Sequence, residues 1–310
     1  MTLLKQDTVA ITGSSGFVGR AVTDYFLGLE WYVRGLDMRD RIDVASPNFC
    51  MAKGNLLFPG PKQVNLNGTD ILIHAAGLTD AYDRSHDDVM EQYNCSLVQE
   101  ALALCHDNHI PCLINVSSAS VYGDVPAPFH EDGPTKPGSK YGQAKLAAEN
   151  IVDKVSKELG LTSFSIRLFS PIGRHQRPGT LPWEAIQAAT LHRQLISLHG
   201  VTWRAWTWVD DFARLCLFIA ENHRRWLPGH YVFNFGSEVM HSQMRLFAAM
   251  ETITQAVVPY VLCQPREFDM VHAGPDMSNT KRFLGDFVSK NTLDSGIKAM
   301  ALHFRATIQQ

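Results

Sequence analysis

Tyr141 and Lys145 place a phenol and an ammonium four residues apart. On a helix this spacing puts both groups on one face. A positive neighbour favours the phenolate and lowers the tyrosine pKa toward neutral pH. Such a tyrosine can take a proton from an alcohol while a hydride leaves the same carbon atom. The same spacing is common in surface pairs, so the surrounding elements decide what it means.

A serine-rich segment, Ser117–Gly123 (SSASVYG), directly follows an apolar run that reads as a buried strand. Parallel sheets bind their ligands beyond the carboxyl ends of their strands. A hydroxyl there can hold a substrate oxygen against Tyr141. Serines are also common in turns for local hydrogen-bonding reasons, so the segment gains meaning only together with Tyr141 and Lys145.

Near the N-terminus, the segment Gly13–Gly19 (GSSGFVG) has glycine at its first, fourth and seventh positions. It lies between a predicted strand and a predicted helix. Glycines at this spacing allow a tight turn, let the backbone approach a pyrophosphate, and permit close packing of the helix on the strand. The helix N-terminus supplies N–H donors and a partial positive charge. The segment therefore predicts a dinucleotide site.

Asp37 ends the second predicted strand, 18 residues after Gly19. A carboxylate at this point binds the ribose diol of NAD and repels the 2′-phosphate of NADP. We therefore expect NAD to be the cofactor. Arg34 and Arg39 flank Asp37, and their positive charge keeps NADP open as an alternative.

The elements that must position these residues alternate along the first half of the chain. Strands are predicted at Thr8–Thr12, Tyr32–Asp37, Phe49–Lys53, Asp70–His74, Cys112–Ser117 and Thr162–Leu168, and helices at Phe17–Leu29, Asp87–Asn108 and Ser139–Glu158. Strands separated by helices imply right-handed βαβ units and a parallel sheet. The predicted fold class is α/β, a Rossmann-like doubly wound parallel sheet with a smaller C-terminal substrate-binding lobe.

The pattern loosens after about residue 170. The segments predicted there are helices at Trp183–His192 and Asp210–Glu221, strands at Arg204–Val209 and His230–Phe235, and a last amphipathic helix at Ile297–Ile308. Alternation would place Trp206 and Trp208 on one strand face with Arg204. We expect residues 1–170 to form the NAD-binding domain, with about 204–235 returning to it. Residues 171–310 would mainly form the interleaved substrate-binding lobe.

Composition limits the class of protein. The chain has 310 residues, 45% of them hydrophobic, which excludes intrinsic disorder. Its 28 basic and 31 acidic residues give a formal charge of −3, so there is no electrostatic reason to expect nucleic acid or an anionic membrane as partner. Apolar runs such as Leu215–Ala220 are far shorter than a membrane span needs. Met1–Asp7 has no apolar core of a secretory signal, and we expect a cytoplasmic protein.

The six cysteines form no CxxC pair, and most lie in apolar stretches. They are expected to be free thiols in a reducing compartment. Cys105, His106, His109 and Cys112 lie close together in sequence, but they span a predicted helix end and strand. We therefore expect no metal site.

Five motifs occur in order: TGSSGFVG, DILIHAAG, VSSASVYG, KYGQAK and RLFSPIG. Together they resemble the extended short-chain dehydrogenase/reductases, the NAD-dependent epimerase/dehydratase family, over about Thr8 to Leu284. Their pattern is closest to that of the UDP-galactose 4-epimerases.

The resemblance implies a role for each matching position. Catalysis would fall to Ser118, Tyr141 and Lys145. The cofactor would be bound by Gly13, Ser15, Gly16, Phe17, Val18, Gly19, Asp37, Asn55, Leu56, Ala75, Ala76, Gly77, Asn94, Tyr141 and Lys145. The substrate would be bound by Thr79, Ser118, Ser120, Ser170, Arg204 and Arg266. It further implies a small-molecule substrate, a nucleotide sugar, and a homodimer formed through the helices at 87–108 and 139–158.

Three departures from the family pattern narrow the expected function. Ala119 and Ser120 stand where the dehydratases carry Asp and Glu, so the acid that eliminates water is missing. Thr79 replaces a lysine of the epimerases, and Ser170 replaces an asparagine. We expect an NAD-dependent nucleotide-sugar epimerase that works through a transient keto intermediate. The alternative is an NAD-dependent dehydrogenase or reductase of a sugar, sugar acid or other small hydroxy compound. A non-catalytic cofactor sensor would not need Ser118, Tyr141 and Lys145.

Overall fold

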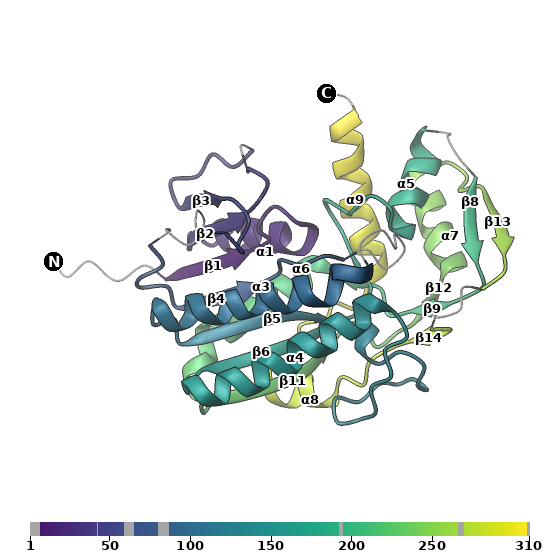
Figure 1. Cartoon of the computed structure of the whole chain (residues 1–310). Coiled ribbons are helices and arrows are strands. Elements are labelled where there is room, and N and C mark those ends of the chain that lie inside the picture. The colour runs from purple at the N-terminus through teal and green to yellow at the C-terminus, as the bar shows by residue number, and fades with distance from the viewer. Residues whose placement is uncertain are drawn as a thin grey trace. The chain divides into compact units, whose positions relative to one another are not determined.

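The computed structural model describes residues 7–41, 43–58, 65–79, 87–191, 195–265 and 270–308 (Figure 1). The chain forms two compact units, each built from separate segments. The first contains Met1–Ser118, Lys140–Arg167 and Ala213–Phe233. The second contains Ala119–Ser139, Leu168–Phe212 and Asn234–Gln310.

The first unit is built on a seven-stranded sheet with the order β11-β6-β5-β4-β1-β2-β3. Its strands are β1 (Thr8–Thr12), β2 (Tyr32–Asp37), β3 (Phe49–Lys53), β4 (Ile71–His74), β5 (Cys112–Ser118), β6 (Thr162–Leu168) and β11 (Gly229–Phe235). The β1–β2, β1–β4, β2–β3 and β4–β5 pairs are parallel. The predicted fold class, a Rossmann-like doubly wound α/β sheet, is confirmed.

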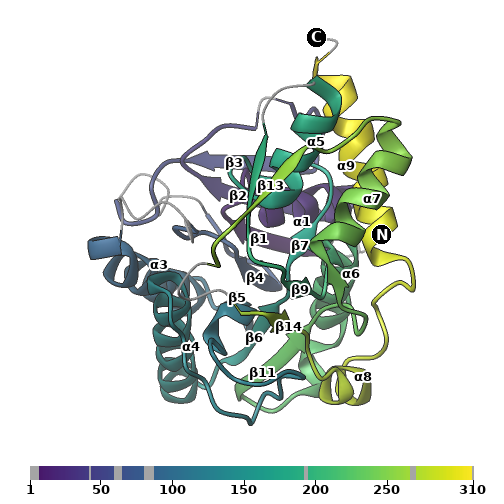
Figure 2. The same ribbon diagram turned by 90° about the vertical axis from the view of Figure 1, so that its right-hand side faces the viewer.

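Helices cover this sheet on both faces, which explains why its strands read as continuous apolar runs. Figure 2 shows α3 (Asp87–Asp107) and α4 (Lys140–Leu159) on one face and α1 (Phe17–Gly28) on the other. All five residues of β1 are buried. A core cluster that includes Leu72, Leu97 and Val152 joins the sheet to α3 and α4. These helices hold the residues of the expected site at the carboxyl ends of the strands.

The second unit combines short strands with helices. Its elements are η2 (Ala119–Val121), β7 (Pro171–Ile172), α5 (Leu181–Leu191), β8 (Ile196–His199), β9 (Trp203–Arg204), β10 (Thr207–Trp208), β12 (His241–Ser242), α7 (Gln243–Thr254), β13 (Tyr260–Cys263), β14 (His272–Ala273), α8 (Ser278–Phe283) and α9 (Thr292–Ile308). α6 (Val209–Asn222) and η3 (His223–Arg225) follow β10. The core of this unit lies among α5, α7, α9 and β8, with Leu246 and Ile297 fully buried.

The single strand predicted at Arg204–Val209 is wrong. Arg204 ends β9, which pairs with β12 and β14, whereas Trp208 ends β10, which pairs with β7. Two-residue alternation therefore does not place Arg204, Trp206 and Trp208 on one face. Trp206 is buried in the core of the second unit. Across the described residues, no helix is both long and apolar enough to span a membrane.

Candidate active site

The glycine loop has the geometry that its sequence predicts. Gly13 has a φ of 69°, and a Cβ atom there would lie 2.7 Å from the carbonyl carbon of Ala75. A Cβ on Gly19 would collide with the carbonyl oxygen of Gly13. Only glycine fits either position, because the backbone segments touch.

Helix α1 begins at Phe17, and its N-cap residue Gly16 provides no side-chain hydrogen bond. The first-turn N–H groups of Phe17, Val18 and Gly19 have no acceptor within an α-helix. They therefore form a cradle of backbone donors for an anion, and the first turn holds no acidic side chain to oppose one. This cradle fits the pyrophosphate of a dinucleotide.

Asp37 ends β2 beside this loop. Its Oδ2 atom accepts from the backbone N–H of Ser15 at 3.0 Å, and its Oδ1 atom accepts from the N–H of Arg39 at 2.9 Å. The Asp37 side chain is only 10% exposed, whereas that of Arg39 is 70% exposed. The Arg39 guanidinium donates to the carbonyl oxygen of Ser15 at 3.0 Å. Asp37 therefore both presents a fixed carboxylate and holds the glycine loop.

Asn55 and Leu56 follow β3. The Asn55 Oδ1 atom accepts from the N–H of Leu57 at 3.0 Å, and its Nδ2 donates to the hydroxyl of Tyr93 on α3 at 3.1 Å. Leu56 is buried. These bonds fix the orientation of the Asn55 amide. The sequence did not point to Tyr93, which lies 38 residues away along the chain.

The segment after β4 is held from two sides. The His74 Nδ1 atom lies 2.8 Å from the hydroxyl of Thr12, and the N–H of Ala76 donates to the same hydroxyl at 3.4 Å. Burial, and secondarily the charge of Lys145, lowers the pKa of His74 to about 3. His74 is therefore neutral at physiological pH. Ala75, next to His74, forms the wall against Gly13.

Asn94, on α3, binds the backbone just beyond Gly77. Its Oδ1 atom accepts from the N–H of Leu78 at 2.8 Å, and its Nδ2 donates to the carbonyl oxygen of the same residue at 3.1 Å. A Cβ on Gly77 would lie 3.0 Å from the Asn94 Oδ1 atom and 3.8 Å from the Lys145 Nζ atom. Asn94, Gly77 and Lys145 are thus brought together.

Lys145 is buried, and its Nζ atom donates to the carbonyl oxygen of Val116 on β5 at 2.8 Å. The same atom lies 5.9 Å from the centre of the Tyr141 ring. Burial lowers the pKa of Lys145 to about 8, and the nearby charge of Glu149 opposes that shift. Ser118 is the last residue of β5, two positions after Val116. The end of β5 and one face of α4 thus carry the three expected catalytic residues.

A charged cluster beneath these residues escaped the sequence analysis. Glu149 on α4 accepts from the hydroxyl of Ser117 and from the guanidinium of Arg167 on β6. The Nη2–Oε2 distance of the ion pair is 2.8 Å, and all three side chains are buried. The only sequence signal was that Glu149 continues the four-residue spacing of Tyr141 and Lys145.

The expected substrate residues fall in both units. Thr79 lies in the first unit, whereas Ser120 in η2, Ser170 and Arg204 lie in the second. Ser170 has a positive φ of 32°, a conformation that asparagine adopts more readily than serine. The Arg204 Nη1 atom donates to the carbonyl oxygens of Trp203 and Met270. Arg266 lies outside the described residues.

The residues of this site lie in a segment that matches a known protein family. The family model described as "NAD dependent epimerase/dehydratase family" matches residues 9–236, which include the glycine loop, Asp37, β5 and α4. The chain belongs to the NAD dependent epimerase/dehydratase family.

Among curated family relatives, the UDP-glucose 4-epimerase of Yersinia pestis is 29% identical over 243 residues, or 71% of each chain. A UDP-glucose 4-epimerase from Stenotrophomonas maltophila, solved with bound NAD and formylated UDP-arabinopyranose, has a TM-score of 0.88 at 20% identity, covering 98% of this chain and 99% of that one. A UDP-glucuronic acid 4-epimerase from Bacillus cereus, solved with UDP-glucuronic acid and NAD, has a TM-score of 0.87 at 19% identity, covering 97% and 99%. These two structures share the family fold.

Metal ligands and reactive thiols are the other groups that could carry chemistry in this chain. The described ranges contain no group of three or more His, Cys, Asp or Glu side chains suited to a metal ion. Cys105, Cys112 and Cys216 are buried free thiols, and burial raises their pKa values. These three buried thiols are therefore poor nucleophiles.

Proposed function

We propose that the protein is an NAD-dependent epimerase of a nucleotide sugar that works through a transient keto intermediate. The observation that carries the proposal is the placement of Lys145 against Tyr141 and the end of β5, beside a glycine loop that fits a pyrophosphate. Relatives named UDP-glucose 4-epimerase support the nucleotide-sugar class. In this proposal residues 1–170, with about 204–235 returning to them, bind the cofactor, and residues 171–310 mainly bind the substrate.

Gly13, Gly16 and Gly19 would hold the pyrophosphate, Asp37 the adenosine ribose, and Asn55 with Leu56 the adenine. When bound, NAD supplies a hydride acceptor that can return the hydride. The loop Ala75–Gly77 would line the cofactor groove. Each contact uses a group whose position the fold fixes by backbone hydrogen bonds or close packing.

The proposed chemical step belongs to three side chains. Ser118 holds the reacting hydroxyl of the sugar, and Tyr141 takes its proton. Lys145 stabilises the phenolate through its positive charge and binds the nicotinamide ribose. The keto intermediate would turn before the hydride returns, so that the hydride reaches the opposite face of the same carbon while Tyr141 returns the proton to the oxygen, and this change of face would invert the carbon. The missing acid at Ala119 and Ser120 argues against elimination of water.

A substrate screen tests this function. Nucleotide sugars are incubated with the enzyme and NAD or NADP, and both the absorbance of reduced cofactor and the stereochemistry of the product are measured. An epimerase inverts one carbon without accumulating NADH. Accumulation of stoichiometric NADH with an oxidised product would instead establish the dehydrogenase alternative. No reaction with any nucleotide sugar would overturn the proposal.

Arg204 offers a second arm of this test, since we assign it to the nucleotide phosphates. Arg204→Ala is expected to raise KM for a nucleotide sugar and leave the Kd of NAD unchanged. An unchanged KM in this variant would exclude the nucleotide-sugar assignment even if the enzyme is active.

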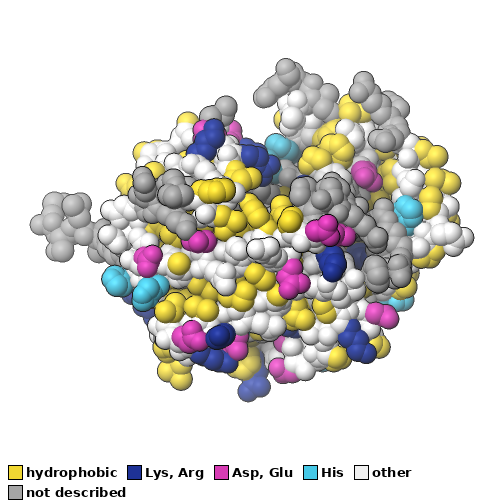
Figure 3. Space-filling view, in the orientation of Figure 1, with side chains coloured by type: hydrophobic (Ala, Val, Ile, Leu, Met, Phe, Trp, Pro, Cys, Tyr) yellow, Lys and Arg dark blue, Asp and Glu magenta, His cyan; other side chains and the backbone are white. Residues whose placement is uncertain are grey.

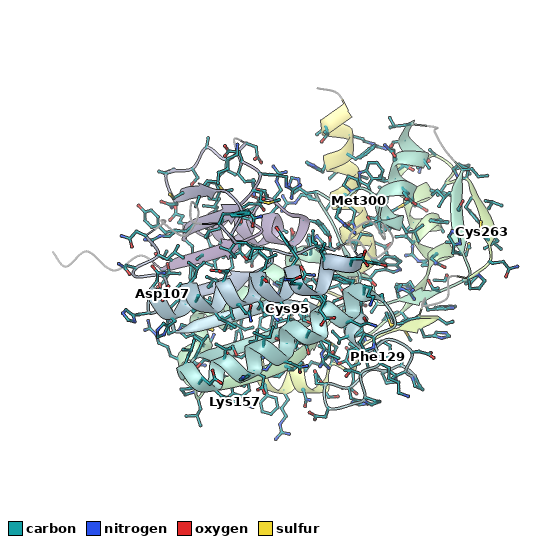
Figure 4. The ribbon with its side chains drawn as sticks, viewed as in Figure 1. Cys95, Asp107, Phe129, Lys157, Cys263 and Met300 are labelled. Carbon is teal, nitrogen blue, oxygen red and sulfur yellow. The ribbon has the colours of Figure 1, made fainter. Side chains whose placement is uncertain are left out.

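The proposal includes a cytoplasmic homodimer that pairs through α3 and α4. Hydrophobic side chains gather over these helices in Figure 3. Val89 is 48% and Leu159 39% exposed, and Figure 4 shows Cys95 on α3 and Lys157 near the end of α4. A C2 dimer would bury such a face. A monomer mass by light scattering at micromolar concentration would exclude it.

A further inference from the structure

Glu149, Ser117 and Arg167 form a buried cluster that the proposed reaction does not use. Glu149 is 3% exposed and Arg167 5%. The Arg167 Nε atom lies 3.1 Å from the Glu149 Oε1 atom, and its Nη2 atom lies 2.8 Å from Oε2, so the pair is bidentate. Burying two charges is costly unless they are paired and hydrogen-bonded. A cluster of this kind needs a reason beyond stability.

The position of the cluster suggests that reason. Lys145 and Glu149 are one turn apart on α4, and they engage consecutive residues of β5. Lys145 donates to the carbonyl oxygen of Val116, and Glu149 accepts from the hydroxyl of Ser117. The next residue along β5 is Ser118. Two bonds from α4 therefore fix the strand end that presents the expected catalytic serine, while Arg167 fixes Glu149 to the neighbouring strand β6.

We propose that Glu149 is a positioning residue of the catalytic site, which holds Ser118 and Lys145 in register through Ser117 and Arg167. This inference rests on the proposed function, because it assigns Glu149 a part in the same site. Glu149 does not touch the reacting atoms. It acts through the end of β5 and through the charge that it places one turn from Lys145.

The charged and titratable groups around Lys145 define the electrostatic part of this role. Tyr141 and Glu149 on α4 and His74 on β4 face Lys145, and Arg167 on β6 and His230 on β11 face Glu149. His74 is neutral, because burial lowers its pKa to about 3. Burial lowers the pKa of Lys145 to about 8, and Glu149 is the carboxylate that opposes this shift. Loss of that carboxylate should therefore lower the pKa of Lys145 further, so that Lys145 loses its proton at lower pH than in the wild type.

Three variants separate the parts of the proposal. Glu149→Gln keeps the shape of the side chain and removes its charge. Ser117→Ala removes only the hydrogen bond between Glu149 and β5. Glu149→Gln also removes the ion pair with Arg167 and could unfold the protein for that reason, in which case Ser117→Ala still tests the proposal. Asp153→Asn is the matched control for loss of a carboxylate on α4, because Asp153 lies one turn further along the helix, 43% exposed, and pairs with Lys157 and His230 rather than with β5.

The first measurement is the rate of hydride transfer at saturating nucleotide sugar across a range of pH. Glu149→Gln should lower the rate by about 100-fold, the scale expected when a reacting group is misplaced by about 1 Å. It should also move the alkaline limb, which reports Lys145, down by about one pH unit. Ser117→Ala should lower the rate without moving that limb, and Asp153→Asn should do neither. Unchanged rates in Glu149→Gln and Ser117→Ala would overturn the proposal.

The second measurement needs no substrate. Calorimetry of NAD binding in buffers of different ionisation enthalpy gives the number of protons exchanged. For the wild type the exchange should be greatest near the Lys145 pKa of about 8 and should disappear in Lys145→Met. The pH of greatest proton exchange should be lower in Glu149→Gln than in the wild type, and it should be unchanged in Ser117→Ala and Asp153→Asn. If the pH dependence of proton exchange in folded Glu149→Gln equals that of the wild type, the electrostatic role of Glu149 is overturned. If the wild type turns over no nucleotide sugar, only the proposed function is overturned.

Discussion

Lys145 donates a hydrogen bond of 2.8 Å to the carbonyl oxygen of Val116, and so anchors α4 to the end of β5. A buried ammonium that is bonded to a backbone oxygen cannot rotate away from the site. It therefore stays 5.9 Å from the centre of the Tyr141 ring even though lysine side chains are intrinsically flexible. In the proposed mechanism the positive charge beside Tyr141 is therefore in place before any substrate binds, which is how electrostatic stabilisation avoids a reorganisation cost.

Tyr141→Phe is expected to separate catalysis from binding. The variant removes the proton-transferring oxygen and keeps the ring beside Lys145. General acid–base groups contribute about 10²–10⁴-fold, so kcat should fall by that factor. The Kd of NAD should change little, because the pyrophosphate cradle and Asp37 are untouched. Single-turnover kinetics and calorimetry check both values, and a full rate in the variant would remove Tyr141 from the mechanism.

Asp37 is expected to make NAD bind more tightly than NADP, because a 2′-phosphate would meet a fixed and poorly solvated carboxylate. Asp37→Asn should narrow the gap between the two Kd values by removing the charge alone. Asp37→Ala should narrow the gap and also weaken NAD, since it removes the bonds to the N–H groups of Ser15 and Arg39. Calorimetry with both cofactors checks this, and tighter binding of NADP by the wild type would contradict it.

His74 should make the protein less stable in acid. Its folded-state pKa is lowered to about 3, mainly by burial, whereas an unfolded histidine titrates near 6.5. Between these values the unfolded chain binds more protons, so stability is lost as pH falls, by about 1.4 kcal/mol per pH unit. Urea unfolding at pH 5.5 and pH 4.5, both between the two pKa values, should show this slope.

Two variants test that assignment. His74→Asn should reduce the slope, because the titrating group is gone. Thr12→Val should keep the slope, because it removes only the hydroxyl at 2.8 Å and leaves the imidazole buried. An equal slope in the wild type and in His74→Asn would show that another group controls acid stability.

Ser170 is expected to be a site of backbone strain. Its φ of 32° is unfavourable for most side chains, and asparagine tolerates positive φ better than serine does. Ser170→Asn should therefore raise the free energy of unfolding, by up to about 1 kcal/mol. Thermal unfolding of Ser170→Asn and Ser170→Gly measures this effect, and a lower transition temperature in both would contradict it.

Local sequence patterns were enough to predict the elements of the first unit and the spacing of its motifs. The apolar run Thr8–Thr12 and the helical spacing after Phe17 are local patterns, and the structure places β1 and α1 there. Glycine at positions 13 and 19 and the four-residue step from Tyr141 to Lys145 are equally local. Such signals depend only on the backbone periods of strands and helices, so they can be read without knowing which elements are neighbours.

Features that depend on which elements are neighbours could be found only in the folded chain. Glu149, Ser117 and Arg167 come from a helix and two strands, and Ser117 is 32 residues from Glu149 along the chain. The lowered pKa values of His74 and Lys145 arise from burial, which no spacing reveals. The segment predicted as one strand at 204–209 instead divides between two small sheets. Its first end pairs with strands near residues 241 and 272, and its second end pairs with a strand near residue 172. Short strands carry too few residues for a period of two to be visible, so only their partners define them.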